Sequence, residues 1–420
     1  MERFNPWWSG EPDPAYESWL QASVRWTPRQ AAELSLEPSA LNFLSGPRQV
    51  GKTTLVKVLI HELRRGHDPR SIFYYSCDEL YDFKELGEVL DSYLSARSAW
   101  GIAGSYIFLD EITFVEEWWR ALKARIDGGA LRSDAVTVTG SASLDLMKQK
   151  EYFPGRRGTG RDVVVRPLSF GEYCGALSKL DLMGSATIEG VAKAVGANAI
   201  HAESLSRMFG DYLQTGGFPL PLREKADRGR VTEVPRRALL DGLRADWGRV
   251  GRNDRYMKEV LAYIFAARGT PISWNGIAKN TSIGSPNTSR SYVETLQDLL
   301  AVEILELIQP DGRVIHRKNR KVHFVDPLLY KVLADYSGQP ADEAALVEGV
   351  VASHLARTFQ TYYWKNGGEV DAVVVEGKEQ VGIETKWGYK EARRPRHLRT
   401  FFALDRTSIR VFLASLRIPF

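Results

Sequence analysis

The chain has 420 residues, enough for two to four domains at about 150 residues each. Its composition, 44% hydrophobic and 26% charged residues, is that of a folded globular protein and excludes a collagen-like or wholly disordered chain. The 56 basic and 52 acidic residues leave a net charge of only +4, so a basic surface for nucleic acid must come from local clustering.

Cysteine content and hydropathy narrow the expected cellular setting. Cys77 and Cys174 are far apart and have no histidine beside them, which argues against a disulfide framework and against a zinc site. The first residues lack the apolar core of a signal peptide, and no stretch reaches the roughly 18 apolar residues of a membrane span. We therefore expect a cytoplasmic protein that makes no contact with a membrane.

Short apolar runs alternate with helical patterns from Leu41 to about Gly171. Apolar strands separated by helices are typical of a parallel sheet that is covered on both faces. The pattern then turns helical from about Ala202 to Ala267. The predicted strands of the first part are Leu41–Leu44, Ser71–Tyr75, Tyr106–Leu109, Val136–Thr139 and Asp162–Val165.

Between the first predicted strand and the first predicted helix lies a full match to the pattern G-x-x-x-x-G-K-[ST], which is the P-loop pattern in its proper context. The glycines let the backbone wrap a polyphosphate so that successive N–H groups point at its oxygens. Lys52 would bring a charge to the β- and γ-phosphates of ATP, and Thr53 a hydroxyl to Mg²⁺. The residues expected to bind ATP here are Gly46, Pro47, Arg48, Gln49, Val50, Gly51, Lys52, Thr53 and Thr54.

A later apolar run, Ser105 to Leu109, is followed directly by two acidic residues, Asp110 and Glu111. In a parallel sheet the ligand site lies at the carboxyl ends of the strands. We therefore expect Asp110 beside the phosphates as the partner of Mg²⁺ through its waters. Glu111 would then polarise the attacking water. The alternative is an acidic strand end that merely caps the next helix.

Polar and basic residues after the next predicted strand extend this site. Thr139 ends this strand and Ser141 lies two residues beyond it, and both are expected near the γ-phosphate, where they would sense hydrolysis. Arg156 lies on the loop beyond and is a candidate for stabilising transition-state charge, in its own subunit or in a neighbouring copy. The second possibility implies a homo-oligomer. A solvated loop arginine is the equally weighted alternative.

The segment from about 256 to 325 has the order of elements of a winged helix. Its long third helix is expected to begin at Ser285, with a proline at the first helical position, and its turn lies at Pro310–Gly312. The stretch from Arg313 to Lys321 holds five basic residues and no acid, which suits a wing that contacts DNA phosphates. The alternative is a winged helix used for packing or protein contacts. The expected elements are Tyr256–Ala267, Ser273–Lys279, the helix from Ser285, and the strands Val302–Leu307 and Val322–Val325.

Near the end of the chain the register of a hairpin can be predicted. Strands from Glu369 to Val375 and from Gln380 to Lys386 flank a two-residue turn that begins with glycine. Asp371 then faces Glu384, Glu369 faces Lys386, and directly opposed Cβ atoms lie roughly 5 Å apart. Two opposed carboxylates repel unless a cation lies between them, and Mg²⁺ suits oxygen ligands. The alternative is a solvated face on which Lys386 neutralises Glu369.

Taken together, several motifs resemble prokaryotic, especially archaeal, AAA-family ATP-binding proteins that carry a C-terminal domain of unknown function. The resemblance implies an AAA core, a helical lid, a winged helix and a restriction-endonuclease-like tail, which we place at residues 1–175, 176–260, 261–330 and 331–420. The motifs that carry it are Asn5–Trp8, Gly46–Thr53, Leu109–Glu111, Thr139–Ser141, Pro167–Glu172 and Gly216–Pro219.

The hairpin also resembles PD-(D/E)xK nucleases, in which an aspartate precedes a Glu-x-Lys strand. That resemblance implies catalytic roles for Asp371, Glu384 and Lys386. It also implies that Glu348, on the preceding helix, joins Asp371 and Glu384 as a metal ligand. A threonine between the glutamate and the lysine, where an apolar residue is usual, departs slightly from the pattern.

We therefore predict an α/β protein with a P-loop, AAA-type parallel sheet, a helical lid, a winged helix and a nuclease-like α/β tail. The predicted function is that of a Mg²⁺-dependent ATPase that acts on DNA, with metal-dependent DNA cleavage by its tail. The alternative is a nucleotide-controlled switch or scaffold that binds a protein partner and has an inactive tail. Salt-sensitive DNA binding would favour the first, and slow turnover without DNA cleavage the second.

Overall fold

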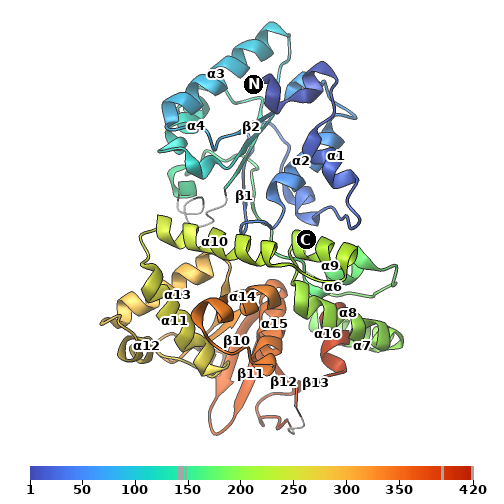
Figure 1. Cartoon of the computed structure of the whole chain (residues 1–420), viewed down its shortest axis with the longest axis vertical. Helices are drawn as coiled ribbons and strands as arrows, with labels where there is room; N and C mark the ends of the chain where they lie inside the picture. The colour runs from blue at the N-terminus through green and yellow to red at the C-terminus, as the bar shows by residue number, and fades with distance from the viewer. Residues whose placement is uncertain (141–145, 147–148, 389–391, 418–420) are drawn as a thin grey trace. The chain divides into compact units, whose positions relative to one another are not determined.

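The computed structural model describes residues 1–140, 146, 149–388 and 392–417. The chain forms two compact units, 1–166 and 167–420, whose helices and strands are labelled in Figure 1. Among the described residues, no helix has the length and apolar character needed to cross a membrane.

The first unit is built on a five-stranded parallel sheet with the strand order β2-β3-β4-β1-β5. Each of the five predicted strands is present, with bounds within one residue of the prediction. The strand β4, which ends at Thr139, lies between β3 and β1. It is therefore a direct neighbour of β1, the strand that leads into the P-loop. The strands are β1 (Leu41–Ser45), β2 (Ile72–Ser76), β3 (Tyr106–Asp110), β4 (Ala135–Thr139) and β5 (Asp162–Val164).

Helices cover both faces of this sheet, as its buried strands require. Successive residues of a strand point to opposite faces, and Phe73 accordingly packs in one hydrophobic cluster while Tyr74 packs in the other. The first cluster includes residues of α3 and α4, and the second includes residues of α2 (Figure 1). The helices are α1 (Pro14–Leu20), α2 (Lys52–Leu63), α3 (Phe83–Ala99) and α4 (Trp118–Asp127).

The Asn5–Trp8 motif covers the edge strand β2. The Asn5 side chain donates to the carbonyl of Tyr74 (2.9 Å) and accepts from its N–H (2.7 Å), as a neighbouring strand would. The indole N–H groups of Trp7 and Trp8 both donate to the carbonyl of Ile72, at 3.1 and 3.0 Å. An exposed edge strand invites pairing with another chain. The motif therefore has a structural role at the edge of the sheet.

The second unit begins with helices, and its strands come later in the chain, before the last helix α16 (Figure 1). Two of its helices start as predicted: Ser273 caps α12 through the N–H of Gly276 (2.9 Å), and Ser285 caps α13, whose first residue is a proline. The helices are α6 (Phe170–Leu177), α7 (Ile188–Asn198), α8 (Ala202–Thr215), α9 (Pro219–Arg228), α10 (Glu233–Arg249), α11 (Asp254–Ala267), α12 (Trp274–Asn280), α13 (Pro286–Asp298), α14 (Pro327–Ser337), α15 (Glu343–Thr358) and α16 (Ser408–Ser415).

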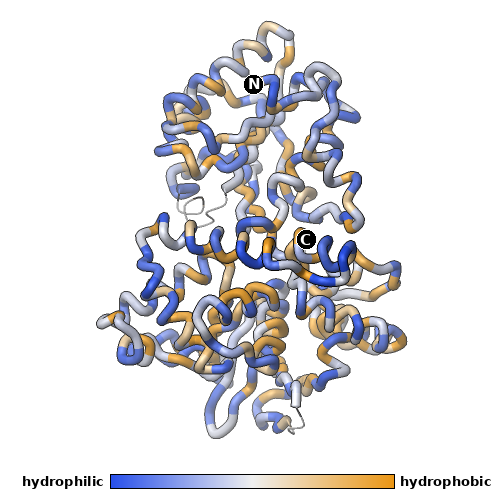
Figure 2. Tube along the Cα trace, viewed as in Figure 1, coloured by the Kyte–Doolittle hydropathy of each residue, from blue (hydrophilic) through white to orange (hydrophobic). Residues whose placement is uncertain are grey.

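Its larger sheet has six strands in the order β13-β12-β11-β10-β7-β8, and a separate pair is formed by β6 and β9. The helix α15 packs on several of these strands and, like α14, is hydrophobic along most of its length (Figure 2). The strands are β6 (Val302–Leu305), β7 (Leu307–Ile308), β8 (Val314–Ile315), β9 (Lys321–Phe324), β10 (Gln360–Lys365), β11 (Glu369–Glu376), β12 (Glu379–Lys386) and β13 (Thr400–Asp405).

The predicted wing differs from a single hairpin. The strand β6 pairs with β9, but the chain leaves this pair after Leu305, and β7 and β8 form their own short hairpin. That hairpin joins the sheet of the tail, because β7 pairs in parallel with β10 at Leu307 and Tyr363 and the carbonyl of Glu306 accepts from the N–H of Tyr363 (3.0 Å). The predicted winged helix and the predicted tail therefore share one sheet.

The Gly216–Pro219 and Pro167–Glu172 motifs meet at a backbone junction in this unit. The carbonyl of Gly217 accepts from the N–H of Leu168 (2.9 Å), and its own N–H donates to Asp326 (2.7 Å). The carboxylate of Asp326 also accepts from the first N–H groups of α14. Gly216 has φ 59° and ψ −161°, which suits only glycine, and a Cβ there would overlap Asp326. These glycines are therefore required for packing.

Candidate functional site

The P-loop joins the end of β1 to the start of α2 at Lys52. Gly46 has φ 154°, and a Cβ at this position would overlap the carbonyl oxygen of Val165. Gly51, with φ 98°, is the N-cap residue of α2. Since it has no side chain, it cannot cap the helix, and the first N–H groups remain a site for an anion. The two glycines thus allow the backbone conformation of the loop, which a residue with a side chain would disfavour.

Lys52 lies over this loop. Its ammonium donates to the carbonyl oxygens of Gly46 (2.9 Å) and Pro47 (3.1 Å), and the residue is 6% exposed. Carbonyl oxygens carry only partial negative charge, so a polyphosphate is a stronger partner for the same ammonium. The side chain is therefore held beside the loop that the sequence assigns to the phosphates.

The carboxylate of Asp110 is the centre at which the predicted residues meet. It accepts from the hydroxyl of Thr53 (2.7 Å), from the hydroxyl of Thr139, and from the N–H of Glu111 (3.1 Å). The group is 2% exposed, so these hydrogen bonds replace lost water. Three separate segments, the P-loop helix and the ends of β3 and β4, therefore converge on one acid.

Tyr74 is a fourth partner of Asp110, and it is not among the residues predicted from the sequence. Its hydroxyl donates to Asp110 at 2.8 Å from the neighbouring strand β2. Burial, together with the negative charge of Asp110, raises the pKa of Tyr74 far above its ordinary value, so the hydroxyl remains a donor. Nothing in the alternation of β2 distinguishes Tyr74 from a core aromatic residue, because only the neighbouring strand reveals its partner.

The oxygens of Thr53 and Asp110 also fit a magnesium ion. A threonine hydroxyl and a carboxylate are the hard oxygen ligands that Mg²⁺ prefers, alongside waters and phosphate oxygens. In this structure the two oxygens are 2.7 Å apart and share a hydrogen bond. These residues would hold the ion together with the nucleotide.

Glu111 follows directly, in a left-handed conformation with φ 53°. Its N–H donates to Thr139 (3.2 Å), which fixes its backbone at the carboxyl end of the sheet. It is also the N-cap residue of the short 3₁₀ helix Ile112–Phe114, and within this described segment its side chain makes no capping hydrogen bond. The alternative prediction, an acid that caps the following helix, is therefore wrong.

Arg156 and Ser141 are the two other residues predicted to lie near the phosphates. Arg156 forms a two-contact ion pair with Asp127 at the end of α4, at 2.6 and 3.3 Å. Its role toward a phosphate stays a prediction. Ser141 lies outside the described residues.

The basic stretch after the turn at Pro310 divides into exposed and engaged residues. Arg313, Arg317 and Lys318 are exposed, although Arg313 also pairs with Asp311 (2.6 Å). Arg320 pairs with Glu306 (3.3 Å) and Lys321 is only 1% exposed. The prediction that all five basic residues suit a phosphate surface is therefore wrong for the last two.

The predicted register of the tail hairpin is confirmed along its described pairs. Val375 pairs with Gln380 and Ala372 with Ile383. The turn contains Gly377, with φ 62°, as a turn that begins with glycine requires. Asp371 and Glu384 therefore belong to the same end of the hairpin, and the N–H of Asp371 donates to Glu384 (3.2 Å).

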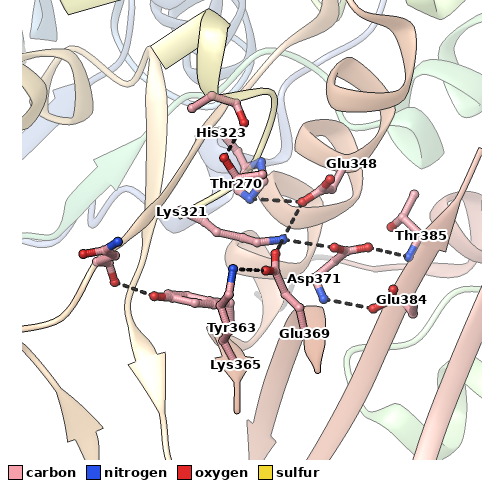
Figure 3. A network of polar contacts seen from close by, with 12 residues as sticks. Thr270, Lys321, His323, Glu348, Tyr363, Lys365, Glu369, Asp371, Glu384 and Thr385 are labelled. Atoms are coloured by element: carbon pink, nitrogen blue, oxygen red, sulfur yellow. Dashed lines mark hydrogen bonds and ion pairs between the residues drawn. The ribbon is translucent and has the colours of Figure 1, made fainter. Parts of the chain in front are cut away.

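The cation among the tail carboxylates is Lys321, from the strand β9. Its ammonium lies 2.8 Å from Glu348, 2.9 Å from Glu369 and 3.0 Å from Asp371, and Figure 3 shows these side chains converging on it. Lys386 instead pairs with Glu384, and Glu369 also pairs with Lys365 (2.7 Å).

The predicted metal set of Glu348, Asp371 and Glu384 therefore does not fit a divalent ion. Among the described residues, no group of three or more histidine, cysteine or acidic side chains is arranged to hold a metal. The physical reason is that a lysine from another element fills the position between the acids. The alternative in which Lys386 neutralises Glu369 is also wrong.

The pKa values in this cluster follow from burial and proximity. Burial by itself lowers the pKa of Lys321, but Glu348, Asp371 and Glu369 outweigh it and raise that pKa, so the ammonium stays charged. Burial raises the pKa of Glu348, and the nearby ammonium of Lys321 opposes that shift. The lysine therefore offsets part of the cost of burying this carboxylate.

Comparisons with known proteins divide the chain in three. Residues 39–174 match the family model of the AAA domain, and residues 206–339 and 343–414 match two domains of unknown function, DUF8612 and DUF4143. An uncharacterized protein of Methanocaldococcus jannaschii is 24% identical over 386 residues, which is 84% of this chain and 77% of that protein.

Three solved structures are similar at low scores. The ORC2 protein of Aeropyrum pernix, in its ADPNP–ADP complexes, is 12% identical over 77% of this chain and 92% of that chain, with a TM-score of 0.38. The ORC1 protein of Aeropyrum pernix, in complex with DNA, is 16% identical over 73% and 89% (TM-score 0.30). A RuvB variant of Thermotoga maritima is 16% identical over 75% and 91% (TM-score 0.28). Together with its P-loop and its five-stranded parallel sheet, the match over residues 39–174 gives this segment the fold of a P-loop, AAA-type domain.

Proposed function

We propose that the chain binds ATP at the Gly46–Thr53 loop and hydrolyses it in a Mg²⁺-dependent reaction. The observation that carries the proposal is the convergence of Thr53, Thr139 and the N–H of Glu111 on the buried carboxylate of Asp110. A P-loop needs a carboxylate beside its threonine, and a residue placed to act on water. Asp110 supports the proposal as that carboxylate, and Glu111, the next residue in the chain, is the proposed residue that acts on water.

Each residue of the site would have a distinct task. Lys52 would exchange the carbonyls of the loop for the phosphate oxygens, and the N–H groups of the loop would hold the same phosphates. Glu111 would accept the proton of the attacking water. Thr139 would hold Glu111 and Asp110 in position, since its hydroxyl forms hydrogen bonds with both residues. A bound Mg²⁺ ion would offset the negative charge of the β- and γ-phosphates.

Replacing Lys52 with alanine is expected to weaken ATP binding by about 10- to 100-fold, because a charge-assisted contact contributes roughly 1.5–3 kcal/mol. Titration calorimetry with a non-hydrolysable ATP analogue measures the effect. Lys84→Ala is a matched control, since Lys84 is exposed on α3 and its loss removes the same charge. Equal affinities of the two variants would remove Lys52 from the site.

We further propose that the second unit contacts DNA, mainly through phosphates. The exposed residues Arg313, Arg317 and Lys318 support this proposal, as does the exposed start of α13. Residues at that start are short and mostly neutral, so the contact would depend little on base sequence. A switch or scaffold that binds a protein remains the rival function, and the pairing of β7 with β10 favours it, because the predicted wing is tied into a sheet.

Replacing Arg313, Arg317 and Lys318 together with alanine is expected to weaken DNA binding across sequences. Its salt dependence should flatten by up to about 0.9 in slope per lost contact. Fluorescence anisotropy with a labelled duplex at several salt concentrations measures both effects. A control that removes three exposed basic residues elsewhere, Lys84, Arg132 and Lys193, should leave the slope unchanged. An identical slope in wild type and wing variant would favour the protein-binding function.

Steady-state ATPase assays distinguish the two functions directly. Stimulation by duplex, single-stranded or branched DNA is the expected result for a protein that acts on DNA, whereas a switch would turn over slowly in each case. The same preparations report the oligomeric state, for which a homo-oligomer that uses Arg156 across a subunit boundary is the proposal to test. The proposed division into an AAA core, a lid, a winged helix and a tail is independent of the outcome.

A further inference from the structure

The acids of the tail and their cation come from different parts of the second unit. Glu348 lies on α15 and Glu369 and Asp371 lie on β11, whereas Lys321 begins β9. The lysine also falls in the segment that matches DUF8612, while the three acids fall in the segment that matches DUF4143. The ammonium therefore joins two segments that differ in their family match.

The position of the ammonium excludes a metal from the same oxygens. It lies 2.8 Å from Glu348 Oε1 and 3.0 Å from Asp371 Oδ1, so an ion at about 2.1 Å from both oxygens would overlap it. The side chain is 1% exposed, and its strand is held by pairing with Leu305 of β6. Lys321 cannot turn outward to make room without a movement of that strand.

The oxygens of Asp371 and Glu384, the pair that a nuclease would use, already have donors. Asp371 accepts from Lys321 with one oxygen and from the N–H of Thr385 (2.9 Å) with the other. Glu384 accepts from the N–H of Asp371 with one oxygen and from Lys386 with the other. Figure 3 shows the Lys321 and Thr385 contacts on opposite sides of Asp371. The pair is therefore satisfied by the protein alone.

We propose that Lys321 is a built-in cation that takes the place of the catalytic metal, so that the tail holds its acids together without a metal and does not cut DNA. Its ammonium fastens β9 to α15 and β11, and so joins the winged-helix segment to the tail. This inference does not depend on ATP hydrolysis or on DNA binding.

A buried histidine, His323, lies beside the cluster and could act as a metal ligand if Lys321 were replaced. His323 lies two residues along β9, its Nε2 is 3.9 Å from Glu348 Oε1, and in the described structure this nitrogen has no hydrogen-bond partner. With a neutral side chain at 321, the imidazole and the three acids would offer the nitrogen and oxygen ligands that Mn²⁺ accepts. Removing one lysine should therefore create a metal site.

The first experiment measures Mn²⁺ binding to nucleotide-free protein by titration calorimetry and by the manganese EPR signal. Wild type and Asp371→Asn should bind the ion equally, and Mn²⁺ should shift their melting temperatures equally. Lys321→Met should gain one site, and that site should disappear in the Lys321→Met, Asp371→Asn double variant. A stoichiometric site in wild type that is lost in Asp371→Asn would overturn the proposal.

A second measurement does not require the Lys321→Met protein to be stable. Removing one partner of a buried ion pair is strongly destabilising, so Lys321→Met should lower the melting temperature by on the order of 10 °C. Adding Glu369→Gln and Asp371→Asn should restore much of the loss, since two of the three uncompensated carboxylates are then neutral. Lys365→Met removes an exposed lysine that contacts only the edge of the cluster, and should cost little. A loss that these neutral substitutions fail to restore would contradict the role of Lys321.

Incubation with plasmid DNA in Mg²⁺ or Mn²⁺ completes the test. Wild type and Asp371→Ala should leave the plasmid intact to the same degree. Nicking by wild type that disappears in Asp371→Ala would show a working nuclease and overturn the proposal, whereas nicking that persists in both proteins comes from a contaminant and agrees with it.

Discussion

Replacing Glu111 with glutamine should slow ATP turnover by about 10²- to 10⁴-fold, the usual contribution of a positioned general base. The amide has the size of the carboxylate but cannot accept the proton of the attacking water. Its backbone contacts to Asp110 and Thr139 involve only the N–H group, so the substitution leaves them in place. We expect ATP binding to be retained, with ATP held unhydrolysed.

The measurement is single-turnover hydrolysis with protein in excess, together with nucleotide affinity by calorimetry. Glu116→Gln is the matched control, because Glu116 is an exposed acid in the same loop region and its loss changes the charge equally. Turnover at the wild-type rate in Glu111→Gln would assign the base to another residue. A parallel loss of binding and turnover would point to a structural role instead.

Gly216→Ala should destabilise the second unit by about 2–5 kcal/mol, the sum of a glycine-only backbone conformation and an overlap in a packed core. The added methyl group would meet the carboxylate of Asp326, which is buried and accepts from Gly217 and from the start of α14. The change therefore disturbs the backbone junction as well as the turn itself.

Urea unfolding followed by circular dichroism measures this effect, and a second glycine offers the control. Gly210 lies inside α8, and a Cβ there would meet nothing within 4 Å. Gly210→Ala should therefore stabilise the protein by about 0.5–1 kcal/mol, because alanine is the better helix former. If the two variants changed the free energy of unfolding by similar amounts, the predicted overlap with Asp326 would be contradicted.

The elements of the first unit could be predicted because each one follows from local sequence. Five apolar runs gave five strands, and acids or hydroxyls at their carboxyl ends met because parallel strands end at one edge. The sequence could therefore bring Thr53, Asp110 and Thr139 to one place, whereas their roles toward a nucleotide stay predictions. Tyr74 was not, since a tyrosine in a buried strand resembles any core residue until its neighbour is known.

In the tail, the pairing of the hairpin strands could be predicted from the sequence, but the cation beside the acids could not. The register that brings Asp371 and Glu384 together follows from a two-residue turn, so it could be predicted from the hairpin alone. The identity of the cation could not, because Lys321 approaches from β9, far away in sequence, at the end of a basic stretch. One signal was present: Lys321 directly precedes the predicted strand Val322–Val325, which makes it the member of that stretch best placed for burial.

The β7–β8 hairpin and Lys321 on β9 together determine which fragments of this chain can be expected to fold. A fragment that starts at residue 343 would leave β10 without its neighbour β7, and its three acids without their ammonium. A fragment that ends at residue 339 would leave Lys321 buried without its three acidic partners. Chimeras between relatives that exchange only one of the two segments should therefore misfold or aggregate, whereas a transplant of residues 302–415 as a single cassette keeps the shared sheet and its ion cluster intact.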